Sequence, residues 1–363
     1  MIDIQNDENW RIQDCNAITC LDELCRHVAF PADEKAKILK ACKRFPLKVS
    51  RYYLNLIDAD DPDCPLRKMA IPDVRELIVS PYELADPIGD THSALNNQPR
   101  PALVHRYQDR VVFMPTTLCG MYCRHCFRRR LAGKHEQNPT QEELDSALSY
   151  IESTAGIREV ILSGGDPLMM DDAALFIILA RIQAAPHVRV LRIHTRMPAV
   201  TPYRITDELV AGLSRFRPLW LVTHFNHPRE LTGVAIEKLR RLTDAGIPLL
   251  NQSVLLKGVN DRVDVLRDLG WGLIEAGVKP YYLHHLDLAQ GLGHFRVSIE
   301  KGVRLIRELQ GTLPGYAIPR YVLDVPEGYG KVPVQYCYLN RMDVQRYQVE
   351  APDGTRVEYL DMG

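Results

Sequence analysis

The sequence contains no apolar run that approaches the roughly 18 residues needed to span a membrane. Its first ten residues, MIDIQNDENW, lack the basic and apolar regions of a secretory signal peptide. Neither sign of charge dominates, because 45 lysines and arginines face 46 aspartates and glutamates, for a formal net charge of −1. The composition therefore predicts a cytoplasmic enzyme that acts on small molecules, with no nucleic-acid partner and no membrane attachment.

Cysteine occurs nine times, and this odd number argues against a disulfide framework, since cytosolic thiols stay reduced. Cys119, Cys123 and Cys126 form the spacing C-x3-C-x2-C, which is one ligand short of a closed zinc site. Three thiolates can instead hold three irons of a [4Fe-4S] cluster and leave the fourth iron open to an exogenous ligand. The alternative is a structural zinc completed by His125 or by a distant cysteine.

The sequence changes texture after Arg110, where short apolar runs begin to alternate with segments of helical periodicity. The expected strands are VVFMPTT, EVILS, VRVLRIHT, LWLVTH, PLLNQSV and KPYYLHHL. This alternation predicts an α/β protein with a parallel sheet that closes wholly or partly into a TIM-like (β/α)6 barrel. Thr140 and Glu143 form a capping-box pattern at the start of one of the helices.

Three regions are expected. Residues 1–108 form an N-terminal helical region and a largely irregular lead-in, rich in Pro, Asp and Asn from about residue 60. Residues 109–290 form the barrel, and residues 291–363 form a short C-terminal extension. Asp353-Gly354 between two alternating runs predicts a hairpin at the end of the chain.

In barrels of this type, chemistry takes place at the carboxyl ends of the strands. The unusual residues of this sequence fall at those positions. They are the three cysteines, Gly164-Gly165-Asp166, His224, Gln252 and Asp287. The two glycines are expected to let backbone groups approach a ligand closely, although an ordinary strand-to-helix turn would also explain them.

Lys331 lies in VPEGYGKVPV, behind two glycines, and the spacing does not match a phosphate-binding P-loop. A lysine on such a loop can swing in and out, as a Schiff-base lysine for pyridoxal phosphate must, although most loop lysines simply face solvent. Arg106, Tyr107 and Arg110, just before the first expected strand, offer two guanidinium groups and a phenol for the phosphate. A surface ion-pair cluster is the alternative.

These features occur together with other matching stretches, in one order, from about residue 60 to 340. They include DPIGDTHS, VHRYQDRVVF, CGMYCRHCFRRRLAG, ILSGGDPL, RIHTRMPAV, THFNHP, LLNQSVLLKGVND, PYYLHHLDLAQGLGHFR and DVPEGYGKVPV. With them the chain resembles the lysine 2,3-aminomutase family of radical S-adenosylmethionine enzymes. The resemblance implies a radical S-adenosylmethionine barrel and an isomerase that interconverts L-lysine and β-lysine through a 5′-deoxyadenosyl radical and pyridoxal phosphate.

The resemblance also implies roles for individual residues. The three cysteines would bind the cluster, Lys331 would carry the pyridoxal phosphate, and Arg128 would pair with the substrate α-carboxylate. The residues that would surround S-adenosylmethionine are His125, Gly164, Gly165, Asp166, His224 and Gln252. Those that would hold pyridoxal phosphate are Arg106, Tyr107 and Arg110. A flavodoxin or ferredoxin would supply electrons.

Asp287 and Asp324 match the lysine enzymes of the family, and two carboxylates would attract the ε-ammonium of lysine and repel glutamate. Strand-end aspartates that cap backbone amides are the alternative. Arg262 stands where longer members have a zinc-binding cysteine, so no structural zinc is expected and the state of assembly is left open. His284 replaces a tyrosine that is common in the family.

Two other functions remain open at this point. A shorter relative makes β-lysine for attachment to translation elongation factor P, but it lacks the Gly-x-Gly-Lys form of the lysine loop and one of the two aspartates, and this chain has both. A non-catalytic iron-sulfur or zinc protein on a barrel scaffold would contain metal without pyridoxal phosphate.

Overall fold

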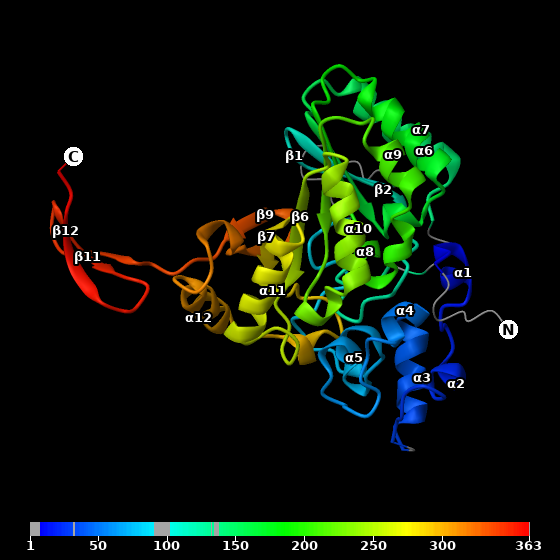
Figure 1. The fold of residues 1–363 in the computed structure, drawn as a ribbon, viewed down its shortest axis with the longest axis horizontal. Helices are drawn as coiled ribbons and strands as arrows, with labels where there is room; N and C mark the ends of the chain where they lie inside the picture. Colours follow the sequence, from blue (N-terminus) through cyan, green and yellow to red (C-terminus); the bar gives the residue numbers. More distant parts are fainter. Residues whose placement is uncertain (1–7, 32, 91–101, 132, 134–137, 363) are drawn as a thin grey trace.

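The computed structural model describes residues 8–31, 33–90, 102–131, 133 and 138–362, and Figure 1 shows their arrangement. Its centre is a nine-stranded sheet whose strands are adjacent in chain order. The strands are β1 (Leu103–Tyr107), β2 (Arg110–Thr116), β3 (Glu159–Gly164), β4 (Val190–His194), β5 (Leu219–Thr223), β6 (Leu249–Val254), β7 (Val278–His284), β8 (Arg320–Val325) and β9 (Gly330–Pro333).

Strands β2 to β8 run parallel, and β1 and β9 pair antiparallel at the two edges. All six expected strands are present, and β8 adds a seventh to the parallel set. The α/β barrel-like fold predicted from the sequence is confirmed. Because the sheet runs from Leu103 to Pro333, it crosses both of the expected domain boundaries, and the division into three regions stays a prediction.

Helices cover the outer face of the sheet. They are α6 (Gln141–Ser153), α7 (Asp172–Gln183), α8 (Met197–Val200), α9 (Asp207–Leu213), α10 (Gly233–Asp244), α11 (Val263–Glu275) and α12 (Ile299–Leu309). Facing them is a register row of fully buried side chains from neighbouring strands, namely Phe113, Leu162, Ile193 and Leu221. The capping box of Thr140 and Glu143 at the start of α6 is confirmed.

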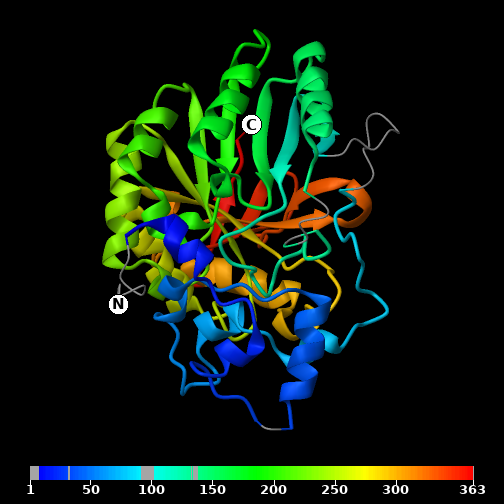
Figure 2. The ribbon, with the colours of Figure 1, turned by 90° about the vertical axis from the view of Figure 1, so that its right-hand side faces the viewer.

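The N-terminal region lies below the barrel as a set of short helices (Figure 2). They are α1 (Trp10–Cys15), α2 (Leu21–Leu24), α3 (Lys35–Arg44), α4 (Arg51–Leu54) and α5 (Pro65–Ala70), followed by the 3-10 turn η1 (Val74–Leu77). The expected lead-in is less irregular than predicted, because α5, η1 and β1 lie within it. Part of it, residues 91–101, lies outside the described residues.

The end of the chain forms a separate three-stranded antiparallel sheet, seen as an arm beside the barrel in Figure 1. It consists of β10 (Leu339–Arg341), β11 (Arg346–Glu350) and β12 (Arg356–Leu360). The predicted hairpin joins β11 to β12 and is confirmed, with Gly354 at a φ of 86° in the turn. Glu350 ties the base of the arm to α12 through an ion pair with Arg307, and its carboxylate also accepts from the hydroxyl of Tyr336.

Candidate active site

The cysteine loop follows β2 and is held against the end of β3 by backbone contacts. The amides of Gly165 and Asp166 donate to the carbonyl oxygens of Thr116 (2.8 Å) and Leu118 (2.7 Å). A Cβ on Gly165 would lie 2.3 Å from the oxygen of Leu118. Gly165 therefore lets the cysteine loop approach β3, and its role beside S-adenosylmethionine stays a prediction.

The three cysteines are partly buried. Cys119 and Cys126 pack against the buried rings of Phe45 and Tyr122. Burial raises the pKa of Cys126 to about 11, and it also raises the pKa values of Cys119 and Cys123. Thiols in such a setting stay protonated until a metal takes the proton's place, because a coordinating thiol is deprotonated outright.

Among the described residues, no three His, Cys, Asp or Glu side chains converge on a single metal ion. A four-iron cluster makes a different demand, because each thiolate binds its own iron at a separate corner of the cluster. The three free and partly buried thiols on one loop fit that demand.

Arg196, just after β4, links the cysteine loop to Glu230, which follows the neighbouring strand β5. Its Nη1 donates to Cys123 Sγ (3.2 Å) and lies 3.0 Å from Nε2 of His125. Its Nη2 donates to Glu230 Oε1 (2.7 Å), and the hydroxyl of Tyr53 donates to the same oxygen (3.0 Å). A buried, paired arginine beside a cluster thiolate offers positive charge where negative charge would collect.

Asp166 is fully engaged inside the protein. Its carboxylate accepts from Thr195 Oγ1 (2.8 and 2.9 Å), from the amide of Arg196 (2.7 Å) and from the amide of Leu168 (3.0 Å). The side chain therefore joins the end of β3 to the end of β4. Because the carboxylate is occupied by these bonds, any contact of Asp166 with S-adenosylmethionine would be made by its backbone.

Four histidines gather at the carboxyl ends of the strands. The rings of His125 and His224 are 5.7 Å apart, and Nδ1 of His194 lies 3.3 Å from Nε2 of Gln252. The fourth is His284. Each of the four rings has one buried nitrogen with no hydrogen-bond partner among the described residues. Burial lowers the pKa of each, so the rings are neutral. Unpartnered buried nitrogens indicate that a polar ligand belongs there.

Lys331 lies on strand β9 and not on an open loop, because the tight turn of Gly328 (φ 86°) and Gly330 (φ 97°) returns the chain antiparallel to β8. The register sets it opposite Asp324, and its Nζ forms an ion pair with that carboxylate. His284 Nδ1 lies 3.3 Å from Lys331 Nζ and 3.4 Å from Asp324 Oδ2. Although burial opposes it, the His284 hydrogen bond and the charge of Lys331 hold the pKa of Asp324 well below its usual range.

Asp287 follows β7 and lies close enough to Asp324 and Lys331 to interact with their charges. Burial, reinforced by the negative charge of Asp324, raises the pKa of Asp287 to about 7. Arg128 is held by Asp90, which accepts from Nε at 2.6 Å, and Nη1 of Arg128 lies 3.4 Å from Ser163 Oγ. The structure thus brings one arginine, one lysine and two acids predicted from the sequence to the same end of the barrel.

Arg106, Tyr107 and Arg110 do not precede the first strand as expected, but form the hairpin of β1 and β2. Tyr107 Oη accepts from the amide of Lys331 (2.9 Å), which brings β1 to β9. Nε of Arg106 is buried and has no partner among the described residues. Arg110 pairs with the adjacent Asp109 (2.9 Å). Of the three groups, Tyr107 contacts the lysine directly.

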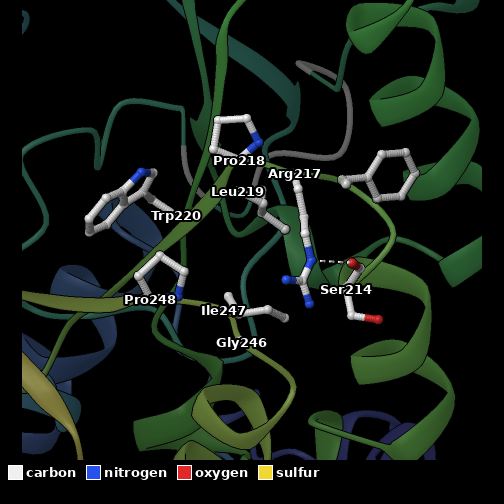
Figure 3. A pocket seen from close by; sticks show the side chains of 9 residues that line it. Ser214, Arg217, Pro218, Leu219, Trp220, Gly246, Ile247 and Pro248 are labelled. Atoms are coloured by element: carbon white, nitrogen blue, oxygen red, sulfur yellow. Dashed lines mark hydrogen bonds between the residues drawn. The ribbon is translucent and has the colours of Figure 1, made fainter.

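A separate pocket lies at the opposite end of the strands, before β5 and β6 (Figure 3). It is lined mainly by apolar and proline side chains, among them Phe216, Trp220 and Pro248, and Arg217 Nε donates there to the Ser214 carbonyl (3.1 Å). Ligands of parallel barrels bind at the carboxyl ends of the strands, so this pocket is not the candidate site.

Four residues of the site are not predicted from the sequence: Asp90, His194, Arg196 and Glu230. His194 and Arg196 lie in RIHTRMPAV and Asp90 in DPIGDTHS, stretches that carry the family resemblance. For these three residues, their positions within those stretches could have indicated a role in the site. Their partners could not be identified, because they are distant in sequence.

Comparison with known proteins agrees with this geometry. The family model of the radical SAM superfamily matches residues 113–269, which include the cysteine loop and β3 to β6. The chain is therefore a radical S-adenosylmethionine enzyme, and its cofactors include S-adenosylmethionine and a [4Fe-4S] cluster. No helix among the described residues is both long and apolar enough to cross a lipid bilayer.

A second family model, lysine-2,3-aminomutase, matches residues 306–356. L-lysine 2,3-aminomutase of Clostridium subterminale is 43% identical over 331 residues, 91% of this chain and 79% of that protein. A protein of the same name from Escherichia coli is 36% identical (90% and 94%), and glutamate 2,3-aminomutase of Clostridioides difficile is 37% identical (91% and 77%). The chain belongs to the lysine 2,3-aminomutase family, and it is an aminomutase that uses pyridoxal phosphate as well.

Proposed function

We propose that the enzyme interconverts L-lysine and β-lysine by moving the amino group between Cα and Cβ. Family membership alone does not select the substrate, since relatives named for lysine and for glutamate are similarly identical to this chain. The choice of lysine rests on the charges at the ends of β7 and β8.

The observation that carries the proposal is the ion pair between Asp324 and Lys331. The pair supports the proposal because an alkylammonium group, the chemical group at the end of a lysine side chain, here lies against this carboxylate. Asp287 adds a second carboxyl to the same place. A glutamate side chain would bring a third carboxylate there, and like charges at short range in a buried site repel strongly.

The cofactors, when bound, would supply hydrogen-atom abstraction and a carbonyl group that carries the migrating nitrogen. Cys119, Cys123 and Cys126 would hold the cluster. Lys331, freed from Asp324, would carry the pyridoxal phosphate, and the buried, unpartnered Nε of Arg106 would bind its phosphate.

The remaining residues would hold the substrate and its surroundings. Arg128, oriented by Asp90, would bind the α-carboxylate through its guanidinium group, while Asp324 and Asp287 would bind the ε-ammonium. The neutral histidines His125 and His224, with Gln252, would face S-adenosylmethionine. Anchoring both ends of the amino acid fixes which hydrogen the radical can reach.

The test is product analysis with anaerobically reconstituted enzyme and a reductant. Lysine, arginine and glutamate are offered in separate reactions. We expect β-lysine from lysine and no β-amino acid from glutamate. Formation of β-glutamate, or the absence of β-lysine from an enzyme with a full complement of cluster and pyridoxal phosphate, would disprove the assignment.

A further inference from the structure

Helix α3 (Lys35–Arg44) carries five cations and no acidic residue. Lys37, Lys40, Lys43 and Arg44 are exposed, and at 100° per residue they fall within a sector of about 120° that excludes buried Ile38 and Ala41. None of the ion pairs between described residues involves Lys37, Lys40 or Lys43. Asp33 and Glu34 precede the helix, so the positive charge is concentrated toward its carboxyl end.

The carboxyl end of α3 packs near the cysteine loop. Phe45, the residue after α3, packs its buried ring against Tyr122, Cys119 and Cys126, and the Phe45 and Tyr122 ring centroids are 6.3 Å apart. The amide of Tyr122 donates to the Lys48 carbonyl (3.0 Å). One layer of side chains therefore separates the end of α3 from the thiols.

A second set of contacts fixes this junction. Nη1 of Arg124 donates to the Pro46 carbonyl (2.8 Å), and its Nε donates to buried Glu76 (2.8 Å). The guanidinium groups of Arg124 and Arg129 lie 4.5 Å from the Phe45 ring centroid. The charged face of α3 is thus held rigidly to the loop that would carry the cluster.

We propose that this face, made of Lys37, Lys40, Lys43 and Arg44, is the docking surface for a small acidic protein that carries single electrons. In the reaction one electron leaves the reduced carrier and enters the cluster, so that the carrier is oxidised and the cluster reduced by one unit each. No bond forms or breaks in this step. The proposal rests on the radical chemistry of the family and is independent of the choice of lysine as substrate.

Charge complementarity is the reason for an acidic partner. Opposite charges on two proteins steer their encounter and raise the association rate, an effect that salt screens. An unpaired cluster of cations at the surface next to a redox centre is the arrangement that such steering requires. In Figure 1 α3 lies below the barrel, on the side opposite the amino ends of the strands.

The test compares two triple variants with the same change in charge. Lys37→Glu, Lys40→Glu and Lys43→Glu reverse the α3 face. Arg189→Glu, Arg215→Glu and Lys279→Glu reverse three exposed cations near the amino ends of β4, β5 and β7. Reduction of the cluster by reduced flavodoxin is followed by its visible absorbance, and flavodoxin binding is measured by calorimetry, both without lysine and at two salt concentrations.

We expect the α3 variant to lose roughly tenfold in the rate of reduction by flavodoxin at low salt and to lose most of its salt dependence. Flavodoxin binding should weaken in parallel. Reduction by dithionite, which needs no docking surface, should be unchanged, and the control variant should behave like the parent enzyme.

Equal rates for the two variants, or a binding site on α3 that serves another partner and leaves flavodoxin reduction unchanged, would overturn the proposal. Loss of reduction by dithionite as well would also overturn it, because the lysines would then support the cluster site itself. An error in the proposed substrate would instead appear as missing β-lysine in the dithionite-driven reaction of the parent enzyme.

Discussion

Asp324 is the side chain on which the choice of substrate depends most directly. Asp324→Asn keeps the shape of the side chain and removes its charge, so the ε-ammonium of lysine loses its partner in a buried site. Truncating one partner of such a pair costs about 2–5 kcal/mol, and we expect kcat/KM for lysine to fall by at least about 30-fold. The measurement is steady-state kinetics over a range of lysine concentrations.

Its control is Asp264→Asn, which removes an exposed carboxylate that pairs with Arg262 on the surface and should leave activity unchanged. Pyridoxal phosphate content, read from absorbance, separates substrate binding from cofactor binding. A large loss of bound pyridoxal phosphate in Asp324→Asn would mean that the carboxylate serves mainly to place Lys331.

Asp287 predicts a dependence on pH. Burial and the charge of Asp324 raise its pKa to about 7, so the carboxyl becomes neutral as the pH falls through that value. The lysine ammonium stays charged throughout, since its ordinary pKa is about 10.4. We expect kcat/KM for lysine to decrease between pH 8 and pH 6 with an inflection near 7.

The inflection should disappear in Asp287→Asn, which cannot ionise. The pH profile of the parent enzyme and of this variant is the measurement. An inflection that persists unchanged in the variant would assign the titration to another group.

At the scale of single residues, the sequence predicted the groups whose chemistry is unusual and missed those whose importance comes from a partner. Three cysteines at fixed spacing and a lysine behind two glycines are recognisable from the sequence alone. Arg196 is not, because its partners Cys123 and Glu230 are 73 and 34 residues away. The same reason hid Asp90, which meets Arg128 only after the sheet has formed.

At the scale of elements, Gly165 determines how the cysteine loop meets β3. Gly165→Ala places a methyl group 2.3 Å from a backbone oxygen that cannot move aside freely. We expect a loss of about 1–3 kcal/mol in the free energy of unfolding, as for other overpacked sites, together with a lower iron content. Urea unfolding and iron analysis measure the two effects.

The matched control is Gly233→Ala at the start of α10, where an added Cβ meets nothing within 4 Å. Alanine favours a helix over glycine, so this variant should be unchanged or more stable by up to about 1 kcal/mol. Equal effects of the two substitutions would show that the close approach at Gly165 does not matter.

The strands and helices of the barrel could be predicted because each repeats a strong local pattern of apolar residues. Strand β1 could not, since Pro and Asn dominate the lead-in before it and its pairing with β2 depends on a hairpin at Gln108 and Asp109. For Lys331, the two preceding glycines indicate a loop. The glycines suggested flexibility, whereas they form the tight turn that starts β9.

At the scale of the whole molecule, the two edges of the open sheet meet at Tyr107 and Lys331, where the tyrosine hydroxyl accepts from the lysine amide. Tyr107→Phe keeps the ring and removes this bond, which is worth about 1 kcal/mol. We expect faster hydrogen exchange at the Lys331 amide and weaker binding of pyridoxal phosphate, with the overall fold retained. Unchanged exchange at Lys331 would show that the edges are held together without this contact.

The central claim is that the whole barrel serves one reaction, the movement of the amino group of lysine between neighbouring carbons. It is tested most directly with L-lysine that carries 15N in its α-amino group, incubated anaerobically with reconstituted enzyme and analysed by NMR. We expect β-lysine with the label bonded to Cβ. Unlabelled β-lysine, label released as ammonia, or no β-lysine at all would contradict it.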